Sequence, residues 1–190
     1  MGPLDYTPSM NPTTRRVAVR LAAASLVFVL VWPRPAPAQS GDPRPAVAVV
    51  NLRFDGEHAN VLQPGDTAIV AAATSMLLAT LAASERVALV DSGTVAAAVA
   101  AAESGGGGNP CDNECAVAVA RGLGARWVTK GTISNLSNLV WLLKAELFDA
   151  TTGKPVLADS YELKGDARLM APKGAHAFAQ RVEKAIGGAR

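Results

Sequence analysis

The amino-acid sequence predicts one α/β (mixed α+β) domain, with a mixed β-sheet of about five strands and helices packed on it. Residues 46–50 (AVAVV) form a continuous apolar run, typical of a strand buried on both faces. Stretches with helical spacing separate it from the next strand, and such crossovers join parallel strands. Residues 139–163 instead hold two alternating segments around a turn sequence, DATTGK, which predicts an antiparallel hairpin. The expected order is β-α-β-α-α-β-β-β-α.

The first half of the domain alternates strands and helices. We expect the first strand to continue through Leu52 and Phe54, and a helix to begin near Asp66 as its N-cap. A second strand follows over residues 86–90 (RVALV), and Asp91-Ser92 then begins a second helix.

A glycine run separates the second and third helices. Residues 104–109 include four consecutive glycines, which predict a flexible surface loop. Asp112 or Asn113 caps the third helix, which ends near Leu123. Three strands and a closing helix complete the domain, over residues 127–133, 139–148, 156–163 and 171–186.

The N-terminal residues 1–38 predict a cleaved signal peptide. Arg15, Arg16 and Arg20 precede the apolar run LAAASLVFVLVW, and a Pro-rich stretch ends in Ala36-Pro37-Ala38. The apolar run is too short for a spanning helix, so a membrane anchor is the less favoured interpretation and no transmembrane segment is expected after processing. Cleavage after Ala38 predicts a periplasmic protein. Sec and twin-arginine export, and a start at Met1 or Met10, stay open.

Removing this leader changes the net charge. The whole chain is +2, with 18 basic and 16 acidic residues. Four basic residues and one acidic residue precede residue 39, which leaves 14 against 15, a net charge of −1. A near-neutral chain without a basic cluster does not favour nucleic-acid binding. We divide the remainder into a polar lead-in (39–45), a single domain (46–187) and a tail (188–190).

Two cysteines, Cys111 and Cys115, lie close together after the glycine run. An even pair in an exported protein predicts a disulfide. Metal ligation or a redox role is the alternative, but redox pairs usually read Cys-x-x-Cys and zinc sites need further ligands.

Several segments together carry a resemblance to known envelope proteins. VAVVNLRF, RVALVD, ARGLGARWVTKGTI and ELFDATTGKPV occur in this order, with the Cys-x3-Cys segment and SNLSNL between them. Over residues 46–185 the chain resembles a family of unknown function among small exported bacterial proteins. That family is similar in fold to the periplasmic domain of the curli-secretion lipoprotein, the penicillin-binding-protein activator lipoproteins and the N-terminal domain of the Tol–Pal translocation protein. The resemblance implies an α/β fold and an envelope location.

Candidate sites for chemistry are few. Asp55, Glu57 and His58 form the alternative ligand set for a metal, although we expect no metal, no cofactor and no catalytic residues. Ser134, Asn135, Ser137 and Asn138 are expected in a loop between strands, either as a turn or as a recognition loop.

The sequence therefore favours a non-enzymatic periplasmic accessory protein that acts through protein contacts in the envelope. A binder of a small molecule or envelope component is the alternative, and an enzyme, metal-dependent or otherwise, ranks last because no nucleophile or acid–base set has a recognisable motif. We expect the contacts at a sheet edge or at the glycine-rich loop.

Overall fold

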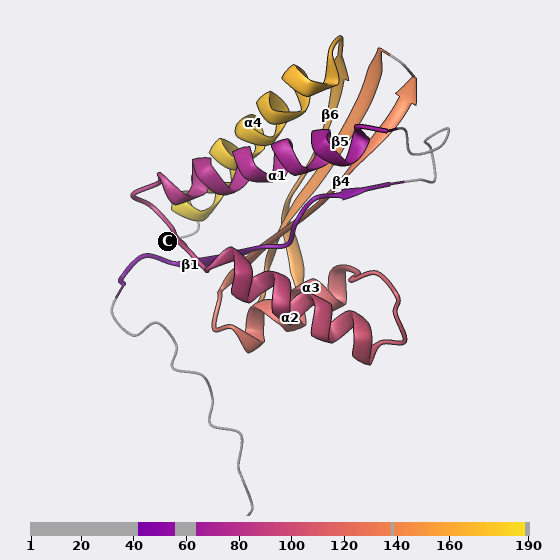
Figure 1. Ribbon diagram of the computed structural model, residues 1–190. Coiled ribbons are helices and arrows are strands. Elements are labelled where there is room, and N and C mark those ends of the chain that lie inside the picture. The colour runs from indigo at the N-terminus through magenta and orange to yellow at the C-terminus, as the bar shows by residue number, and fades with distance from the viewer. Residues whose placement is uncertain (1–41, 56–63, 138, 189–190) are drawn as a thin grey trace, which may run out of the picture. The chain divides into compact units, whose positions relative to one another are not determined.

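A computed structural model describes residues 42–55, 64–137 and 139–188. The expected signal peptide, residues 39–41 of the lead-in, Glu57, His58 and Asn138 lie outside these residues. The elements in chain order are β1 (Ala46–Val49), β2 (Arg53–Phe54), α1 (Asp66–Ala82), β3 (Ala88–Leu89), α2 (Ser92–Gly105), α3 (Asn113–Gly122), β4 (Trp127–Ser137), β5 (Val140–Asp149), β6 (Lys154–Lys164) and α4 (Ala167–Gly188) (Figure 1).

The strands form one mixed sheet, which confirms the predicted fold class. Its order is β3-β1-β4-β5-β6, and the short β2 also pairs with β4. β1 runs parallel to β3 and β4, whereas β4, β5 and β6 are joined as antiparallel hairpins. Six strands form where about five were expected, because the first apolar segment divides into β1 and β2.

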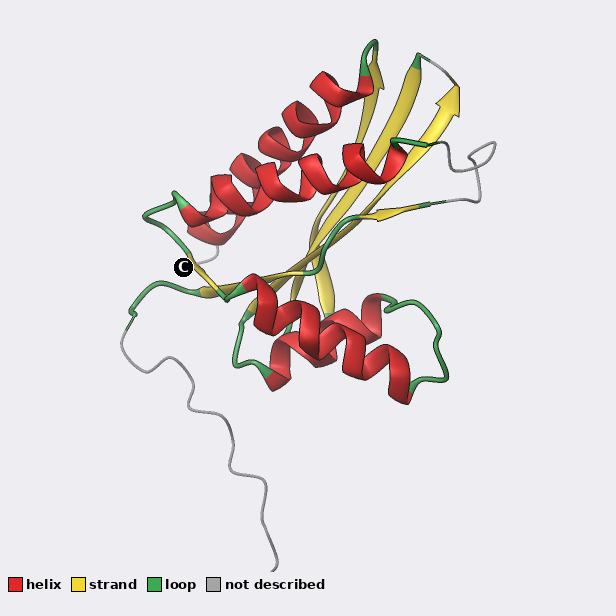
Figure 2. Cartoon of the chain, in the orientation of Figure 1, coloured by secondary structure: helices red, strands yellow, loops and turns green. Residues whose placement is uncertain are grey.

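Helices cover the sheet on both faces, so the domain has three layers (Figure 2). Alternation along β1 separates two cores: Val47 and Val49 pack with α1 and α4, while Ala48 and Val50 pack with α2 and α3. Burying each valine side chain fully is worth about 1.5–3 kcal/mol. This two-sided burial explains why residues 46–50 are continuously apolar.

Some predicted boundaries were wrong. The first strand does not run unbroken to Phe54, because the Leu52 N–H turns away from the sheet and donates to Thr74 Oγ1 in α1 at 3.2 Å. Asp66 is not the N-cap of α1. Gly65 takes that position with φ 103°, which favours glycine, and Asp66 lies in the first turn. The second strand, β3, has two residues instead of five.

The expected loop at Ser134, Asn135 and Ser137 is also wrong. These residues continue β4 and pair with Leu142, Trp141 and Val140 of β5. Cross-strand pairing thus overrides the turn preference of Ser and Asn.

Gly131 lets the middle of β4 approach its neighbours closely. A Cβ at this position would lie 2.6 Å from the Lys144 carbonyl oxygen of β5 and 2.7 Å from Leu52 Cδ2. Backbone at such a distance cannot give way without moving a strand.

The connection between α2 and α3 holds the predicted cysteine pair. The structure joins Cys111 and Cys115 through their sulfur atoms, with 5.2 Å between their Cα atoms. Asp112 caps α3 between them, since its Oδ1 accepts the Cys115 N–H at 2.8 Å. The glycine run before it ends α2 at Gly105 and turns through Gly107 and Gly108, both with positive φ.

Gly131→Ala should destabilise the domain by about 1–3 kcal/mol, because the added methyl overpacks the sheet. Urea unfolding measures the change. Gly122→Ala is the matched control, since no atom lies within 4 Å of its Cβ position at the end of α3. Equal stability of the two variants would contradict the close approach of β4 and β5.

Oxidation of Cys111 to Cys115 stays a prediction for the protein in the cell. Thiol labelling in denaturant should find no free thiol before reduction and two after it. Reduction should lower the unfolding free energy by about 2 kcal/mol, the loop-entropy value for so short a ring. The Cys111→Ser, Cys115→Ser double variant should match the reduced protein. Labelling of both cysteines without reductant would rule the bridge out.

Candidate functional site

One edge of the sheet ends early and leaves a groove. β3 pairs only with Ala46 and Val47 of β1. Beyond Val47, the described residues place no strand on this side of β1, nor on the outer side of β2. The sheet edge from Val49 to Phe54 therefore lies between α1 on one face and α2 on the other.

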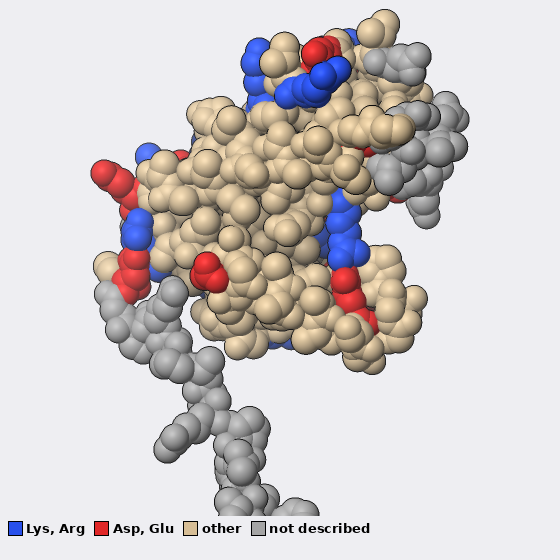
Figure 3. Space-filling model, viewed as in Figure 1, with Lys and Arg blue, Asp and Glu red and all other residues tan. Residues whose placement is uncertain are grey.

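The groove has a volume of about 780 Å³. Its walls come from α1 and α2 and carry mostly small or apolar side chains, and its floor is the segment from Asn51 to Phe54. Figure 3 shows that this side of the molecule is largely uncharged between its two helical layers. Its lining residues are Asn51, Leu52, Arg53, Phe54, Thr67, Val70, Ala71, Thr74, Ser75, Leu78, Ser92, Gly93 and Ala96.

The floor of the groove presents backbone that no strand in the described part of the chain covers. The Val50 N–H donates to Thr129 O at 3.0 Å, and the Asp55 N–H donates to Ile133 O at 2.9 Å, so both residues point toward β4. Because backbone groups alternate in direction along a strand, the N–H and C=O of Phe54 point away from β4 and into the groove. An unpaired strand edge is a template for another strand.

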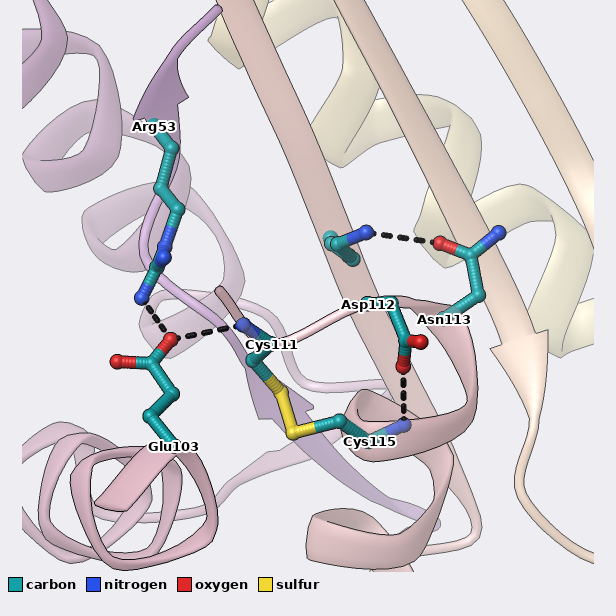
Figure 4. Close-up of a disulfide and its surroundings, with 7 residues drawn as sticks. Arg53, Glu103, Cys111, Asp112, Asn113 and Cys115 are labelled. Carbon is teal, nitrogen blue, oxygen red and sulfur yellow. Dashed lines mark hydrogen bonds and ion pairs between the residues drawn. A yellow bond between two sulfur atoms is a disulfide. The ribbon is translucent and has the colours of Figure 1, made fainter. Parts of the chain in front are cut away.

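A second, smaller cavity of about 150 Å³ continues the groove along α2 and shares Asn51, Arg53 and Ala96 with it. At its end the Arg53 guanidinium contacts the Glu103 carboxylate through Nη2 (Figure 4). The same carboxylate oxygen accepts the Cys111 N–H at 2.8 Å. Glu103 is thus engaged by two donors and is the less exposed partner, at 22% against 37% for the Arg53 side chain.

The start of α2, at the other end of the helix from Glu103, is held by an N-terminal cap. Asp91 Oδ1 accepts hydrogen bonds from the Thr94 N–H at 2.7 Å and the Thr94 hydroxyl at 2.8 Å. These hydrogen bonds hold the pKa of the Asp91 carboxyl below its usual value. The cap stays charged at neutral pH and keeps Ser92 and Gly93 in place beside the groove.

The other edge of the sheet, β6, carries charge along its length. Lys154, Asp159, Glu162 and Lys164 lie on it, together with Pro155. Asp159 is engaged twice: the Tyr161 hydroxyl donates to its Oδ2 at 2.8 Å, and Arg181 of α4 lies 3.1 Å from the same oxygen. Burial, followed by the Asp159 contact, raises the pKa of Tyr161 to about 12. Charged residues and proline are common devices that keep an edge strand from pairing.

The residues singled out from the sequence do not come together. Ser134 is buried within β4, and Asn135 and Ser137 follow it on the same strand, away from the groove lining. Asp55 directly follows β2, whereas Glu57 and His58 of the alternative metal set lie outside the described residues. His176 is exposed on α4, where its ring nitrogens lie 3.0 Å from Thr80 Oγ1 and 3.1 Å from Gln180 Nε2.

Neither metal-site nor membrane features are found in the residues that the structure describes. No three His, Cys, Asp or Glu side chains gather there as a metal set would. None of the helices in 42–55, 64–137 and 139–188 combines the length and apolar character needed to cross a bilayer.

Sequence reasoning expected an exposed edge but did not identify the groove residues. The sequence features that could have indicated the groove residues are weak. A charged residue, Arg53, interrupts an apolar strand, and the facing side of α1 carries Ala71, Thr74 and Ser75 among larger residues. Whether such positions face a groove depends on the short length of β3, which is a tertiary property.

Solved structures with a similar fold come from bacteria. TolB from Acinetobacter baumannii superposes with a TM-score of 0.50 at 13% identity, covering 77% of this chain and 29% of that one. This chain thus corresponds to less than a third of that protein. The LpoB C-terminal domain from Escherichia coli gives a TM-score of 0.47 at 21% identity, covering 67% and 87%. No protein with a curated description matches the sequence.

The expected likeness in fold to the Tol–Pal translocation protein, TolB, is therefore confirmed. A family model described as "Protein of unknown function (DUF2380)" matches residues 45–181, which is most of the chain. The chain belongs to this family of unknown function, DUF3280.

Proposed function

We propose that this protein is a non-enzymatic accessory protein of the bacterial envelope, exported to the periplasm, that works by binding other proteins. The observation that carries the proposal is the largely uncharged groove between α1 and α2, along a sheet edge that no strand of the described residues pairs with. Such edges bind extended segments of other chains through main-chain hydrogen bonds. The leader at residues 1–38 supports the export step.

The contrast between the two sheet edges supports a binding role for one of them. β6 carries four charged residues and a proline, which oppose pairing. The groove edge carries one charged residue, Arg53, among thirteen lining residues. A fold that protects one edge and leaves the other accessible has the asymmetry expected of a binding surface.

A small-molecule or envelope-component binder is the alternative. The groove volume lies within the range of ligand sites, about 300–1,000 Å³. Such sites also need convergent polar groups, and Thr74 in the wall is already engaged by the Leu52 N–H and the Val70 carbonyl. The groove therefore supplies backbone and apolar surface more than specific polar contacts, which favours a polypeptide.

An enzymatic role receives little support from the residues. His176 contacts a threonine and a glutamine, and neither is an acid or a nucleophile activated by a charged partner. A catalytic histidine needs a hydrogen-bonded orienting group and a reacting atom within reach.

The immobilised protein should capture a partner protein from periplasmic extract. The His58→Ala, His176→Ala double variant should capture it within about twofold of the parent amount, since the proposal gives neither histidine a role in binding and a substitution at an exposed position such as His176 usually changes free energies by about 0.5 kcal/mol or less. Quantitative mass spectrometry of the captured proteins gives the ratio, and circular dichroism checks folding.

Two results would refute the binding proposal. One is the absence of any protein enriched over a blank matrix. The other is a folded double-histidine variant that has lost its partner, which would instead favour a metal or an acid–base site.

A further inference from the structure

We propose that the groove binds an extended peptide segment of a partner protein, which pairs with the sheet edge at β2 and places an acidic side chain against Arg53. The inference rests on the proposed binding function and names its surface and the chemistry of its partner. It follows from the backbone direction at the edge, the size of the wall residues and the charge at one end.

The groove accommodates a strand in the plane of the sheet. β3 occupies the outer side of Ala46 and Val47, and the chain then continues into α2 at Ser92, so none of the described strands pairs with the edge beyond it. A strand added there would lie beside Phe54, whose N–H and C=O point outward, at the usual spacing of about 4.8 Å between strands. Its hydrogen bonds to the sheet edge would continue the ladder that β3 forms with Ala46 and Val47 of β1.

The walls determine which side chains such a segment carries. In a strand, successive side chains point to opposite faces. One set would face Val70, Ala71 and Leu78 of α1, and the other would face Gly93 and Ala96 of α2. Both walls are uncharged, so the side chains of the segment should be small or apolar on both of its faces over the length of the groove.

Arg53 provides the charge complementarity. A guanidinium has five N–H donors, and the contact with Glu103 uses Nη2. Arg53 lines both the groove and the smaller cavity, so its other guanidinium N–H groups lie where the two meet. A carboxylate on the incoming segment would be the matching acceptor.

A second copy of this chain fits the groove less well. Of the two sheet edges that a second copy has, the edge at β2 is recessed between its own α1 and α2. The other edge is β6, which carries Lys154, Asp159, Glu162 and Lys164. Inserting those charges between two uncharged walls would remove them from water without partners, which is unfavourable. The occupant is therefore a segment of a different protein.

A displayed library of random dodecapeptides, selected on the protein purified from cells that express the full chain, tests this inference. Enriched peptides should consist mainly of apolar or small residues and contain Asp or Glu. They should bind about tenfold or more weakly to Ala71→Leu, Ala96→Leu protein, whose groove is filled, given that a bulky side chain in a packed space displaces its occupant. The matched control is Ala72→Leu, Ala97→Leu, one residue away on each helix and outside the groove lining.

Two further measurements separate strand pairing from general adhesion. N-methylation of alternate peptide residues should abolish binding for one parity and spare the other, because only alternate N–H groups face the edge. Arg53→Met should remove the preference for Asp over Asn in the peptide, a preference of about tenfold for a charge-assisted hydrogen bond. Arg126→Met, at a half-exposed arginine outside the groove, is the control.

The outcomes are decisive in either direction. The peptide-groove assignment would be overturned if no peptide were enriched, or if peptides bound equally to the filled and control variants. Binding that is insensitive to N-methylation, or self-association of the protein through this edge, would overturn it as well. If the filled variant still captures the partner from extract, the binding function stands and the groove is wrong. If no partner is captured by any variant, the proposed function itself fails.

Discussion

The hydrogen bonding of β4 along both of its sides is the constraint on which the rest of the structure depends. β4 pairs with β1 and β2 on one side and with β5 on the other. It thereby joins the parallel half of the sheet to the antiparallel half, and its alternate residues enter the two cores. Gly131 sits at the centre of this arrangement, where a larger residue would force the strands apart. The groove depends on the same strand, because β4 holds β2 in the sheet while β3 is too short to pair beside it, and no other described strand does so.

The features that follow from short-range chemistry could be predicted from the sequence. Asp91 and Asp112 cap their helices because a carboxylate needs only the N–H groups two or three residues ahead. The DATTGK hairpin forms for the same reason: Asp149 Oδ1 accepts the Thr151 N–H at 2.7 Å. Ser134–Ser137 show the limit of such reasoning, since their local preference for a turn loses to pairing with β5.

The sequence could predict that a binding site lies at a sheet edge, but not which edge or which residues form it. A sheet with ends must have edges, so binding at an edge was a reasonable expectation. Which edge is available depends on β3 stopping after two residues and on helix positions that no local pattern encodes. The Ser-Asn segment has an unusual composition, whereas about half of the groove lining is alanine, glycine, threonine and serine, which line a groove only because α1 and α2 face each other.

The pairing of β1 has a consequence for how the chain is made. Val47 pairs with Trp127, 80 residues further along, and the ribosome delivers the N-terminal partner first. The apolar run at residues 46–50 is therefore synthesised about 80 residues before the strand that will cover one of its sides. Antiparallel β4, β5 and β6 come later and are close in sequence, so they can pair almost as they emerge. An apolar segment that waits in this way is open to aggregation until its partner strand is available.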